Sequence, residues 1–265
     1  MTVFNLEAQF DPPTIASNLQ KVHSRVTSAC NLAGRNPDSV RLLAVSKKWG
    51  AGVVIEAIQA GQRDFGENYV AEGVEKIAAV RAWLAVNALP VDLSPPLQWH
   101  CIGPVQSNKT RLVAENFDWL QSLDRLKIAE RLSEQRPLNL PPLQVCLQIN
   151  IDGSASKSGI APGAEALALA LAVEQLPRLR LRGLMAIPEP AINSIAARAV
   201  FIRLTAVFDQ INEALRSSGG LAEPMDTLSI GMSADLEPAI EAGSTMVRVG
   251  TAIFGVRSSA AGSAF

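Results

Sequence analysis

The feature that most constrains this chain is a regular alternation of short apolar runs with longer segments of helical periodicity. Short runs bounded by Gly, Pro or polar residues are typical of buried strands, and apolar residues three or four positions apart are typical of helices. The runs predict eight strands, at residues 41–46, 63–66, 97–102, 117–122, 143–149, 181–186, 227–230 and 246–249. The segments between them predict seven helices, near residues 52–60, 70–86, 107–115, 124–135, 164–176, 194–216 and 234–242.

Strands that alternate with helices predict a parallel sheet, because each chain segment returns to the next strand through a crossover. An α/β fold of the (β/α)₈ TIM-barrel type fits this number of units, and such barrels typically have about 250 residues. A doubly wound open sheet is the alternative, but no GxGxxG turn follows the first predicted strand. We therefore expect a single barrel domain over residues 1–265.

Several segments lie outside the repeated pattern. Residues 15–33 predict an extra N-terminal helix, with Thr14 as its cap and Gly34 at its end. Residues 82–96 predict an enlarged loop, and residues 1–13 and 257–265 predict flexible ends.

Composition excludes several classes of function. The chain has 24 Lys and Arg against 25 Asp and Glu, a net charge of −1, which does not favour binding to nucleic acid or an anionic membrane. The longest apolar stretch, residues 166–173, is too short to span a membrane, and the N-terminus has no signal-peptide pattern. We therefore expect a soluble protein. The three cysteines are odd in number and form no CxxC motif, so we expect buried thiols and a cytoplasmic location. The two histidines, His23 and His100, lie in no metal-binding motif, so we expect no metal site.

Residues that directly follow the strands are the candidates for chemistry, because barrel active sites form at the carboxyl ends of the strands. Lys47 follows the first predicted strand. In the barrel mouth its ammonium group would be partly dehydrated, which lowers the pKa of the amine, and a neutral amine forms an imine with a carbonyl compound. Taken alone, however, Lys47 is more simply interpreted as a solvated surface lysine.

The ends of the seventh and eighth strands add a second signal. Gly231, Met232 and Ser233 follow the seventh strand, and Gly250 and Thr251 follow the eighth. Loops at these positions of barrels frequently bind phosphate through backbone N–H groups at the start of a helix. The alternative for Ser233 is an ordinary N-cap of the helix predicted to start near residue 234.

Arg248 lies within the eighth predicted strand, and strand alternation alone does not decide whether it points into the barrel or outward. Inside, it could donate to the ring nitrogen of a heterocycle or to a phosphate. The first and eighth strands are neighbours in a closed barrel, so Lys47 and the phosphate loops would meet a single ligand. That ligand would carry an aldehyde and a phosphate, as pyridoxal 5′-phosphate (PLP) does.

Six blocks of sequence then match a known family in order: LLAVSK (42–47), AGQRDFGENYVAEGVEKI (60–77), WHCIGPVQSNK (99–109), QINIDGSASKSGI (148–160), LRGLMAIPEP (181–190) and DTLSIGMSADLEPAIEAGSTMVRVGTAIFG (226–255). Over about 215 residues the chain resembles the YggS/PROSC family of pyridoxal phosphate homeostasis proteins.

The resemblance implies a barrel like the N-terminal domain of alanine racemase, with PLP bound covalently as a Schiff base. It assigns the Schiff-base lysine to Lys47 and places Asn68, from a Glu67-Asn68-Tyr69 block, near the cofactor. It assigns the remaining cofactor contacts to Gly231, Met232, Ser233, Asp235, Arg248, Gly250 and Thr251. Lys157 matches a second lysine of the family, which the resemblance associates with ligand exchange.

One departure from the family concerns the segment after Lys47. Many relatives have another lysine two positions further on, whereas here Lys48, Trp49 and Gly50 follow. We expect Lys48 to face a different direction from Lys47.

The resemblance leaves open whether the protein is an enzyme. Racemisation needs two bases on opposite faces of the α-carbon. In the racemases the second base is a tyrosine from another domain. Here Tyr69 is the only tyrosine, and about 16 residues follow Val249, so we expect no second domain.

We therefore favour a binding protein for intracellular PLP (vitamin B6) homeostasis, and thereby for amino-acid balance, with no catalytic residue. A weakly active racemase-like enzyme is the first alternative, and a scaffold that senses PLP occupancy is the second. The expected partners are PLP and apo-enzymes that accept it, and we expect a monomer.

Three further residues are weaker candidates. His100 ends the third predicted strand, where it either approaches the PLP ring or has a structural role. Asp152 and Glu189 are expected to be solvated loop residues rather than a carboxylate pair.

Overall fold

A computed structural model describes residues 14–87, 94–154, 157–218 and 224–256. Within these residues eight parallel strands form a closed barrel in which each strand pairs with the next and the last pairs with the first. The strands are β1 (Arg41–Val45), β2 (Asp64–Glu67), β3 (Gln98–Cys101), β4 (Trp119–Leu123), β5 (Leu143–Gln148), β6 (Leu179–Met185), β7 (Thr227–Met232) and β8 (Met246–Val249). The predicted barrel is confirmed, and the open-sheet alternative is wrong.

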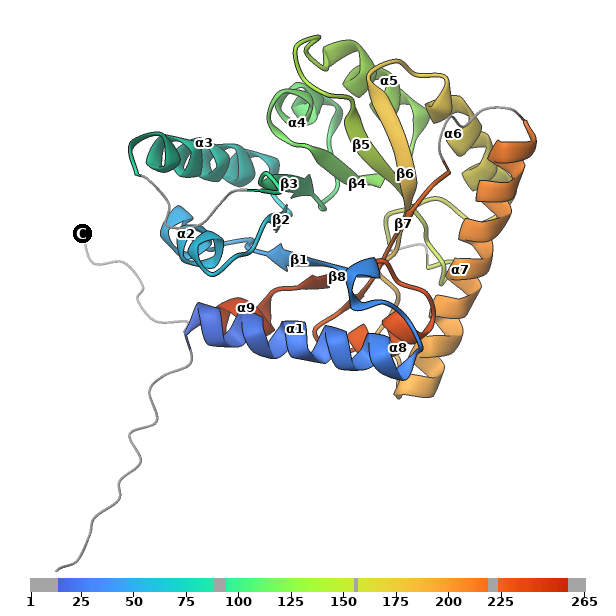
Figure 1. The fold of residues 1–265 in the computed structure, drawn as a ribbon. Helices are drawn as coiled ribbons and strands as arrows, with labels where there is room; N and C mark the ends of the chain where they lie inside the picture. Colours follow the sequence, from blue (N-terminus) through green and yellow to red (C-terminus); the bar gives the residue numbers. More distant parts are fainter. Residues whose placement is uncertain (1–13, 88–93, 155–156, 219–223, 257–265) are drawn as a thin grey trace, which may run out of the picture.

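Helices surround the barrel on its outer side (Figure 1). They are α1 (Ile15–Leu32), α2 (Ala51–Gln59), α3 (Val70–Val86), α4 (Thr110–Asn116), α5 (Leu126–Gln135), α6 (Ala164–Glu174), α7 (Ser194–Ser217), α8 (Leu236–Glu241) and α9 (Thr251–Phe254). Two 3₁₀ turns, η1 (Pro37–Ser39) and η2 (Ser107–Lys109), precede β1 and α4. The seven predicted helices are present, whereas α9 was not predicted.

The predictions at the chain ends and in one long loop have different outcomes. Residues 82–86 continue helix α3 instead of belonging to a loop, because the helix ends only at Val86. Residues 88–93 and the two predicted flexible ends, residues 1–13 and 257–265, lie outside the described part of the chain.

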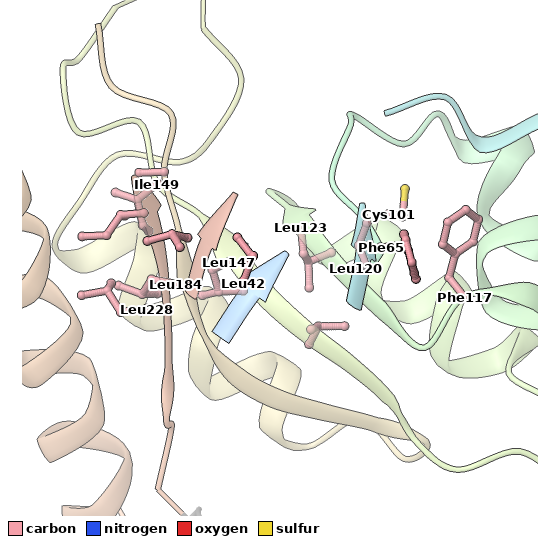
Figure 2. Close-up of a cluster of buried hydrophobic side chains, with 14 of the residues drawn as sticks. Leu42, Phe65, Cys101, Phe117, Leu120, Leu123, Leu147, Ile149, Leu184 and Leu228 are labelled. Atoms are coloured by element: carbon pink, nitrogen blue, oxygen red, sulfur yellow. The ribbon is translucent and has the colours of Figure 1, made fainter. Parts of the chain in front are cut away.

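The main hydrophobic core lies between the strands and the helices. Leu42, Phe65, Leu120, Leu184 and Leu228 point outward from five different strands into this layer (Figure 2). Because side chains alternate along a strand, the residues between them point into the barrel. They form small separate clusters there, one around Leu43, Ile102 and Met246 and one around Trp119, Cys146 and Met185.

The three cysteines have the environment that the sequence predicts. Cys30, Cys101 and Cys146 are free and buried. Burial raises the pKa of the Cys101 and Cys146 thiols to about 12, so both are neutral at physiological pH. These side chains therefore act as small apolar residues of the interior.

The extra N-terminal helix packs against the last part of the barrel. Thr14 caps α1 by accepting a hydrogen bond from the Ser17 N–H at 3.1 Å. The buried face of the helix is formed by Leu19, Val22, Val26, Ala29 and Cys30. Helix α1 lies beside α8 and α9, the two helices that flank β8 (Figure 1). None of the described helices is both long and apolar enough to cross a membrane.

Candidate functional site

A pocket of about 310 Å³ opens at the carboxyl ends of the strands. It is lined by Val45, Lys47, Asn68, Ile102, Ile187, Met232, Ser233, Ala234, Arg248, Gly250 and Thr251. Seven of the nine residues that the family resemblance assigned to cofactor contacts, including Lys47 and Asn68, are among the lining residues, whereas Gly231 and Asp235 are not. The apolar wall of Val45, Ile102 and Ile187 was not predicted, although each of these residues lies at or just after the end of a strand.

Lys47 and Lys48 separate at a tight turn after β1. The turn closes with a hydrogen bond from the Trp49 N–H to the Ser46 carbonyl at 3.0 Å, and Lys48 has a positive φ of 63°. Lys47 faces the pocket, and its amine has no hydrogen bond with any described residue. The Lys48 ammonium lies instead over the ring of Tyr69, 5.9 Å from its centroid. The expected difference in direction between the two lysines is therefore present.

Arg248 points into the barrel and forms part of the pocket floor. Its Nη1 donates to the Ser229 carbonyl at 2.6 Å and to Ser229 Oγ at 2.7 Å, and its Nη2 donates to the Ala186 carbonyl at 2.8 Å. These acceptors are neutral, and no described carboxylate forms an ion pair with the guanidinium. Burial lowers the pKa of Arg248 to about 10, which still leaves it charged at pH 7. The charge of Arg248 is opposed only at longer range, by Asp235, so the guanidinium can still interact with an anionic group of a ligand.

A row of polar side chains continues from Ser229 through the barrel interior toward the amino ends of the strands. The Ser229 hydroxyl donates to Gln121 Oε1 at 2.7 Å, so the amide nitrogen of Gln121 faces His100 Nδ1 at 2.9 Å. The other ring nitrogen of His100 lies 3.2 Å from Asp64 Oδ1. Barrel interiors are usually filled by branched apolar residues, so a continuous polar row is a distinctive feature of this one.

His100 has a structural position in this row rather than a place in the pocket. It is fully buried, stacks on Trp119 with ring centroids 5.0 Å apart, and is absent from the pocket lining. Burial lowers the pKa of His100, although the hydrogen bond to Asp64 opposes the shift. A neutral imidazole that accepts at Nδ1 and donates at Nε2 satisfies both neighbours.

Asn68 supplies an unsatisfied acceptor to the pocket. Its Oδ1 atom is buried and has no hydrogen-bond partner. Buried polar atoms normally have a partner, so an orphaned oxygen that lines a cavity points to a donor on a ligand or water. Its neighbours Glu67 and Tyr69 do not line the pocket: Glu67 is buried behind it and Tyr69 is exposed.

The loop after β7 differs in detail from the prediction. Strand β7 extends to Met232, and α8 begins at Leu236 with Asp235 as its N-cap, so Ser233 is not the cap and the helix does not start near residue 234. The cause is the Asp235 carboxylate, which accepts the Met232 N–H at 2.6 Å and holds residues 232–235 as a turn. The six-residue helix α8 is too short for its N-terminus to define an anion site.

Two features keep this turn close to the pocket. Gly231 has a φ of +91°, and a Cβ there would lie 2.5 Å from the Ala239 Cβ, so only glycine fits without strain. Arg25 on α1 donates to the Ser233 carbonyl at 3.0 Å and forms a two-bond ion pair with Glu237. The extra helix thus holds the backbone of the loop, while the hydroxyls of Ser233 and Thr251 have no partner among the described residues.

A neighbouring pocket of about 200 Å³ shares Asn68, Ile102 and Ile187 with the first and contains Lys157. The Lys157 ammonium forms ion pairs with Asp152 and Glu189, both at 3.1 Å. Asp152 and Glu189 are exposed loop residues, as predicted, and in addition each pairs with Lys157. The sequence did not predict this, because the residues come from different loops. Across the described ranges there is no group of three His, Cys, Asp or Glu side chains arranged to hold a metal ion.

Comparison with known proteins gives concordant matches. The family model described as alanine racemase, N-terminal domain, matches residues 15–258. A protein of Pseudomonas aeruginosa named pyridoxal phosphate homeostasis protein is 55% identical over 244 residues, which cover 92% of this chain and 96% of the relative. The protein of the same name from Escherichia coli K12 is 52% identical, over 92% of this chain and 97% of the relative.

Two solved structures show how widely the fold is shared. PipY of Synechococcus elongatus PCC7942, solved with PLP bound, is 32% identical and superposes with a TM-score of 0.73 over 91% of this chain and all of that chain. An alanine racemase of Clostridium difficile 630 is 14% identical, with a TM-score of 0.65 over 91% of this chain and 57% of that chain. At that identity the second match shows only the common barrel.

Proposed function

Since the chain belongs to the family of pyridoxal phosphate homeostasis proteins, we propose that it binds PLP in the carboxyl-end pocket as a Schiff base on Lys47. The observation that carries the proposal is one cavity that contains two groups without a hydrogen-bond partner and one guanidinium without an ion pair. They are the free amine of Lys47, the guanidinium of Arg248 without an anion, and the orphaned Oδ1 of Asn68. PLP offers an aldehyde, an anionic phosphate and a heteroaromatic ring with polar substituents, so it is chemically complementary to all three.

The covalent step needs only Lys47 and water. The neutral amine adds to the aldehyde carbon, water leaves, and an imine remains. Addition of water to the imine reverses the step and releases PLP. The open pocket mouth suits such an exchange, because solvent can reach the bond.

The rest of the pocket would hold the other groups of PLP. Met232, Ser233, Gly250 and Thr251 surround the position that we assign to the phosphate, where the free hydroxyls of Ser233 and Thr251 can donate hydrogen bonds. Arg248 would donate to the ring nitrogen or to the phosphate. Ile102 and Ile187 supply apolar surface for the ring. When bound, PLP supplies an electrophilic carbon and an electron-withdrawing ring.

A binding role fits the pocket better than catalysis. Among the described residues that line it, Lys47 is the only side chain whose amine could act as a base, because Arg248 keeps its charge at pH 7. Two-base chemistry at an α-carbon would need a second such group. Tyr69 lies outside the pocket against Lys48. We therefore propose that the protein stores and releases PLP, which influences vitamin B6 and amino-acid pools, and that weak racemase-like activity is the alternative.

The proposal also includes a cellular compartment and an oligomeric state. Three free, buried thiols suit a reducing compartment, so we assign the protein to the cytoplasm. There it would act as a monomer and pass PLP to apo-enzymes that require it. Analytical ultracentrifugation of the PLP-loaded protein should give the mass of a single chain.

Borohydride reduction of the PLP-loaded protein, followed by peptide mass mapping, tests the Schiff base. We expect a pyridoxyl adduct on Lys47 and loss of the imine absorption band in Lys47→Ala, with the band retained in the neighbouring control Lys48→Ala. An adduct on Lys48 or Lys157, or a band that survives in Lys47→Ala, contradicts the assignment.

Two further measurements separate a binding protein from an enzyme. The binding role predicts that PLP moves to an apo-enzyme while amino acids in the mixture keep their α-protons. The enzyme alternative predicts exchange of those protons with deuterated solvent, which Lys47→Ala abolishes.

A further inference from the structure

A buried cluster of charged residues lies directly behind the turn that carries Lys47. Glu67 is fully buried at the end of β2, and Lys76 of α3 is 5% exposed. The Lys76 ammonium lies 2.6 Å from Glu67 Oε1 and 3.2 Å from Glu72 Oε1. None of these residues lines the PLP pocket. The pocket contacts described above therefore leave the cluster without a role.

The cluster binds the residue before Lys47. Ser46 is fully buried and donates from its hydroxyl to Glu67 Oε1 at 2.5 Å. The Ser46 carbonyl accepts a hydrogen bond from the Lys76 ammonium at 2.8 Å. With Glu67 and Glu72, this carbonyl provides one acceptor for each of the three N–H groups of Lys76.

The cluster also binds the residue after Lys47. The backbone N–H of Lys48 donates to Glu72 Oε1, the same oxygen that contacts Lys76. Lys48 has the positive φ that bulky residues rarely adopt, which requires support from its surroundings. Both neighbours of Lys47 are thus anchored to one group of three side chains, whereas the Lys47 side chain itself is free.

Helix α3 is built so that it can reach this turn. Glu72 and Lys76 are one helical turn apart and share a face. Gly73 lies between them, and a Cβ there would be 2.6 Å from Phe117 Cζ and 3.2 Å from Glu67 Cβ. The missing side chain lets α3 approach β2 closely, as the adjacent positions of the two elements in Figure 1 show.

A buried ion pair contributes little net stability, because desolvation offsets most of the attraction, but removing one partner is strongly unfavourable. Such a cluster is better suited to fixing one conformation. We propose that Glu67, Glu72 and Lys76 are positioning residues that clamp the 46–48 turn and direct the Lys47 amine toward the carbonyl carbon of the ligand. This inference rests on the proposed function of Lys47.

Glu72 gives the sharpest test, because its carboxylate is partly exposed and its loss leaves the Lys76–Glu67 pair intact. In Glu72→Ala the Lys48 N–H loses its acceptor and the turn gains freedom. We expect PLP to bind about tenfold more weakly, the effect of one charge-assisted hydrogen bond. Glu75→Ala is the matched control, since Glu75 is exposed on the same helix and forms no hydrogen bond or ion pair with the cluster.

Pyridoxine 5′-phosphate separates positioning from general support of the pocket. It has the ring and phosphate of PLP but a hydroxymethyl group in place of the aldehyde, so it cannot react with Lys47. We expect Glu72→Ala to bind it within about twofold of the wild-type affinity, by isothermal titration calorimetry. Glu72→Gln keeps an oxygen acceptor and should restore part of the PLP affinity.

Each outcome decides the proposal. Unchanged PLP affinity in Glu72→Ala, or equal weakening of both ligands, overturns it. If Glu72→Ala does not fold, Glu72→Gln decides: a loss of about threefold or more for PLP alone supports the clamp, and no loss contradicts it. Failure of the proposed function would look different, because the wild-type protein would then form no pyridoxyl adduct on Lys47 after borohydride reduction.

Discussion

The two ends of the barrel each have a pocket that contains arginine, but the arginines differ in their partners. At the carboxyl end, Arg248 donates only to neutral oxygens and lies beside the unpaired Lys47. At the amino end, a pocket of about 210 Å³ is lined by Arg41, Arg136 and Arg182. The amino-end arginines are more numerous, but two of the three form ion pairs with carboxylates.

Each of the three amino-end arginines has identifiable partners within the protein. Arg41 pairs with Asp64, and Arg182 pairs with Asp226 and donates to Gln144 Oε1 at 2.8 Å. Arg136 donates to the backbone carbonyls of Ala114, Phe117 and Pro141 at 2.7–2.8 Å. Arginines in a cavity therefore do not by themselves mark a ligand site. What distinguishes the carboxyl end is that Arg248 lies beside an amine and an amide oxygen without partners, whereas the amino end of a barrel usually serves stability.

The largest contrast between the two ends should appear in PLP affinity. We expect Arg248→Met to weaken PLP binding roughly 10- to 100-fold, because a hydrogen bond from a charged group contributes about 1.5–3 kcal/mol. Arg182→Met should leave the affinity within about twofold and lower the melting temperature, since Asp226 loses its ion pair. Absorbance titration and thermal unfolding check both variants. Equal losses of affinity would remove the distinction between the two pockets.

Gly231 tests whether the carboxyl-end loop is built for close packing. Gly231→Ala adds a Cβ that would lie 2.5 Å from Ala239, at a φ of +91°. We expect the free energy of unfolding to fall by about 2–3 kcal/mol, from overpacking together with backbone strain. Gly34→Ala is the control, because Gly34 has a φ of +66° but no atom near its added Cβ. Urea unfolding should show a loss of only about 1 kcal/mol there. Losses of equal size would mean that contact with Ala239 is unimportant.

Two threonines at opposite ends of β8 provide a finer comparison. Thr251 lines the carboxyl-end pocket, whereas Thr245 accepts from the Leu228 N–H at 2.8 Å and donates to the Asp226 carbonyl at 3.0 Å. We expect Thr251→Ala, like Ser233→Ala, to weaken PLP binding roughly three- to tenfold, the effect of one hydrogen bond. Thr245→Ala should reduce stability without changing that affinity. The idea fails if Thr245→Ala lowers the PLP affinity as much as Thr251→Ala does.

The smallest expected effect is the pH dependence of the amino end. Burial raises the pKa of Asp64, but its hydrogen bond and charge interactions with His100 and Arg41 outweigh burial and lower it. A carboxyl whose pKa is lower in the folded state stabilises the protein above its unfolded pKa of about 3.9, and this stabilisation is lost as the pH falls through the folded value. Asp64→Asn should therefore be less stable than wild type at pH 7, with the difference shrinking below about pH 4. A difference that stays constant across this range would contradict the assignment.

The sequence was informative where local pattern decides the structure. The spacing of apolar runs predicted the barrel, and the rule that active sites follow strands singled out Lys47, Gly250 and Thr251, all of which line one pocket. The sequence was less informative where a hydrogen bond between a side chain and the backbone decides the local structure. The helix after β7 starts later than predicted, because Asp235 accepts the Met232 N–H. His100 could not be placed from sequence, since its position depends on Asp64 and Gln121 from neighbouring strands.

The order of strands and helices, and the residues at each strand end, follow from the sequence alone, because periodicity and turn residues are local properties of the chain. Which of those residues have partners depends on tertiary structure. Arg25 reaches the Ser233 loop across 208 positions, and Lys76 reaches the Ser46 carbonyl across 30. Burial and hydrogen bonding between distant segments exist only after the barrel closes. They decide that the Lys47 amine has no partner and Arg248 no ion pair, whereas Arg41 and Arg182 of the amino end are paired with carboxylates.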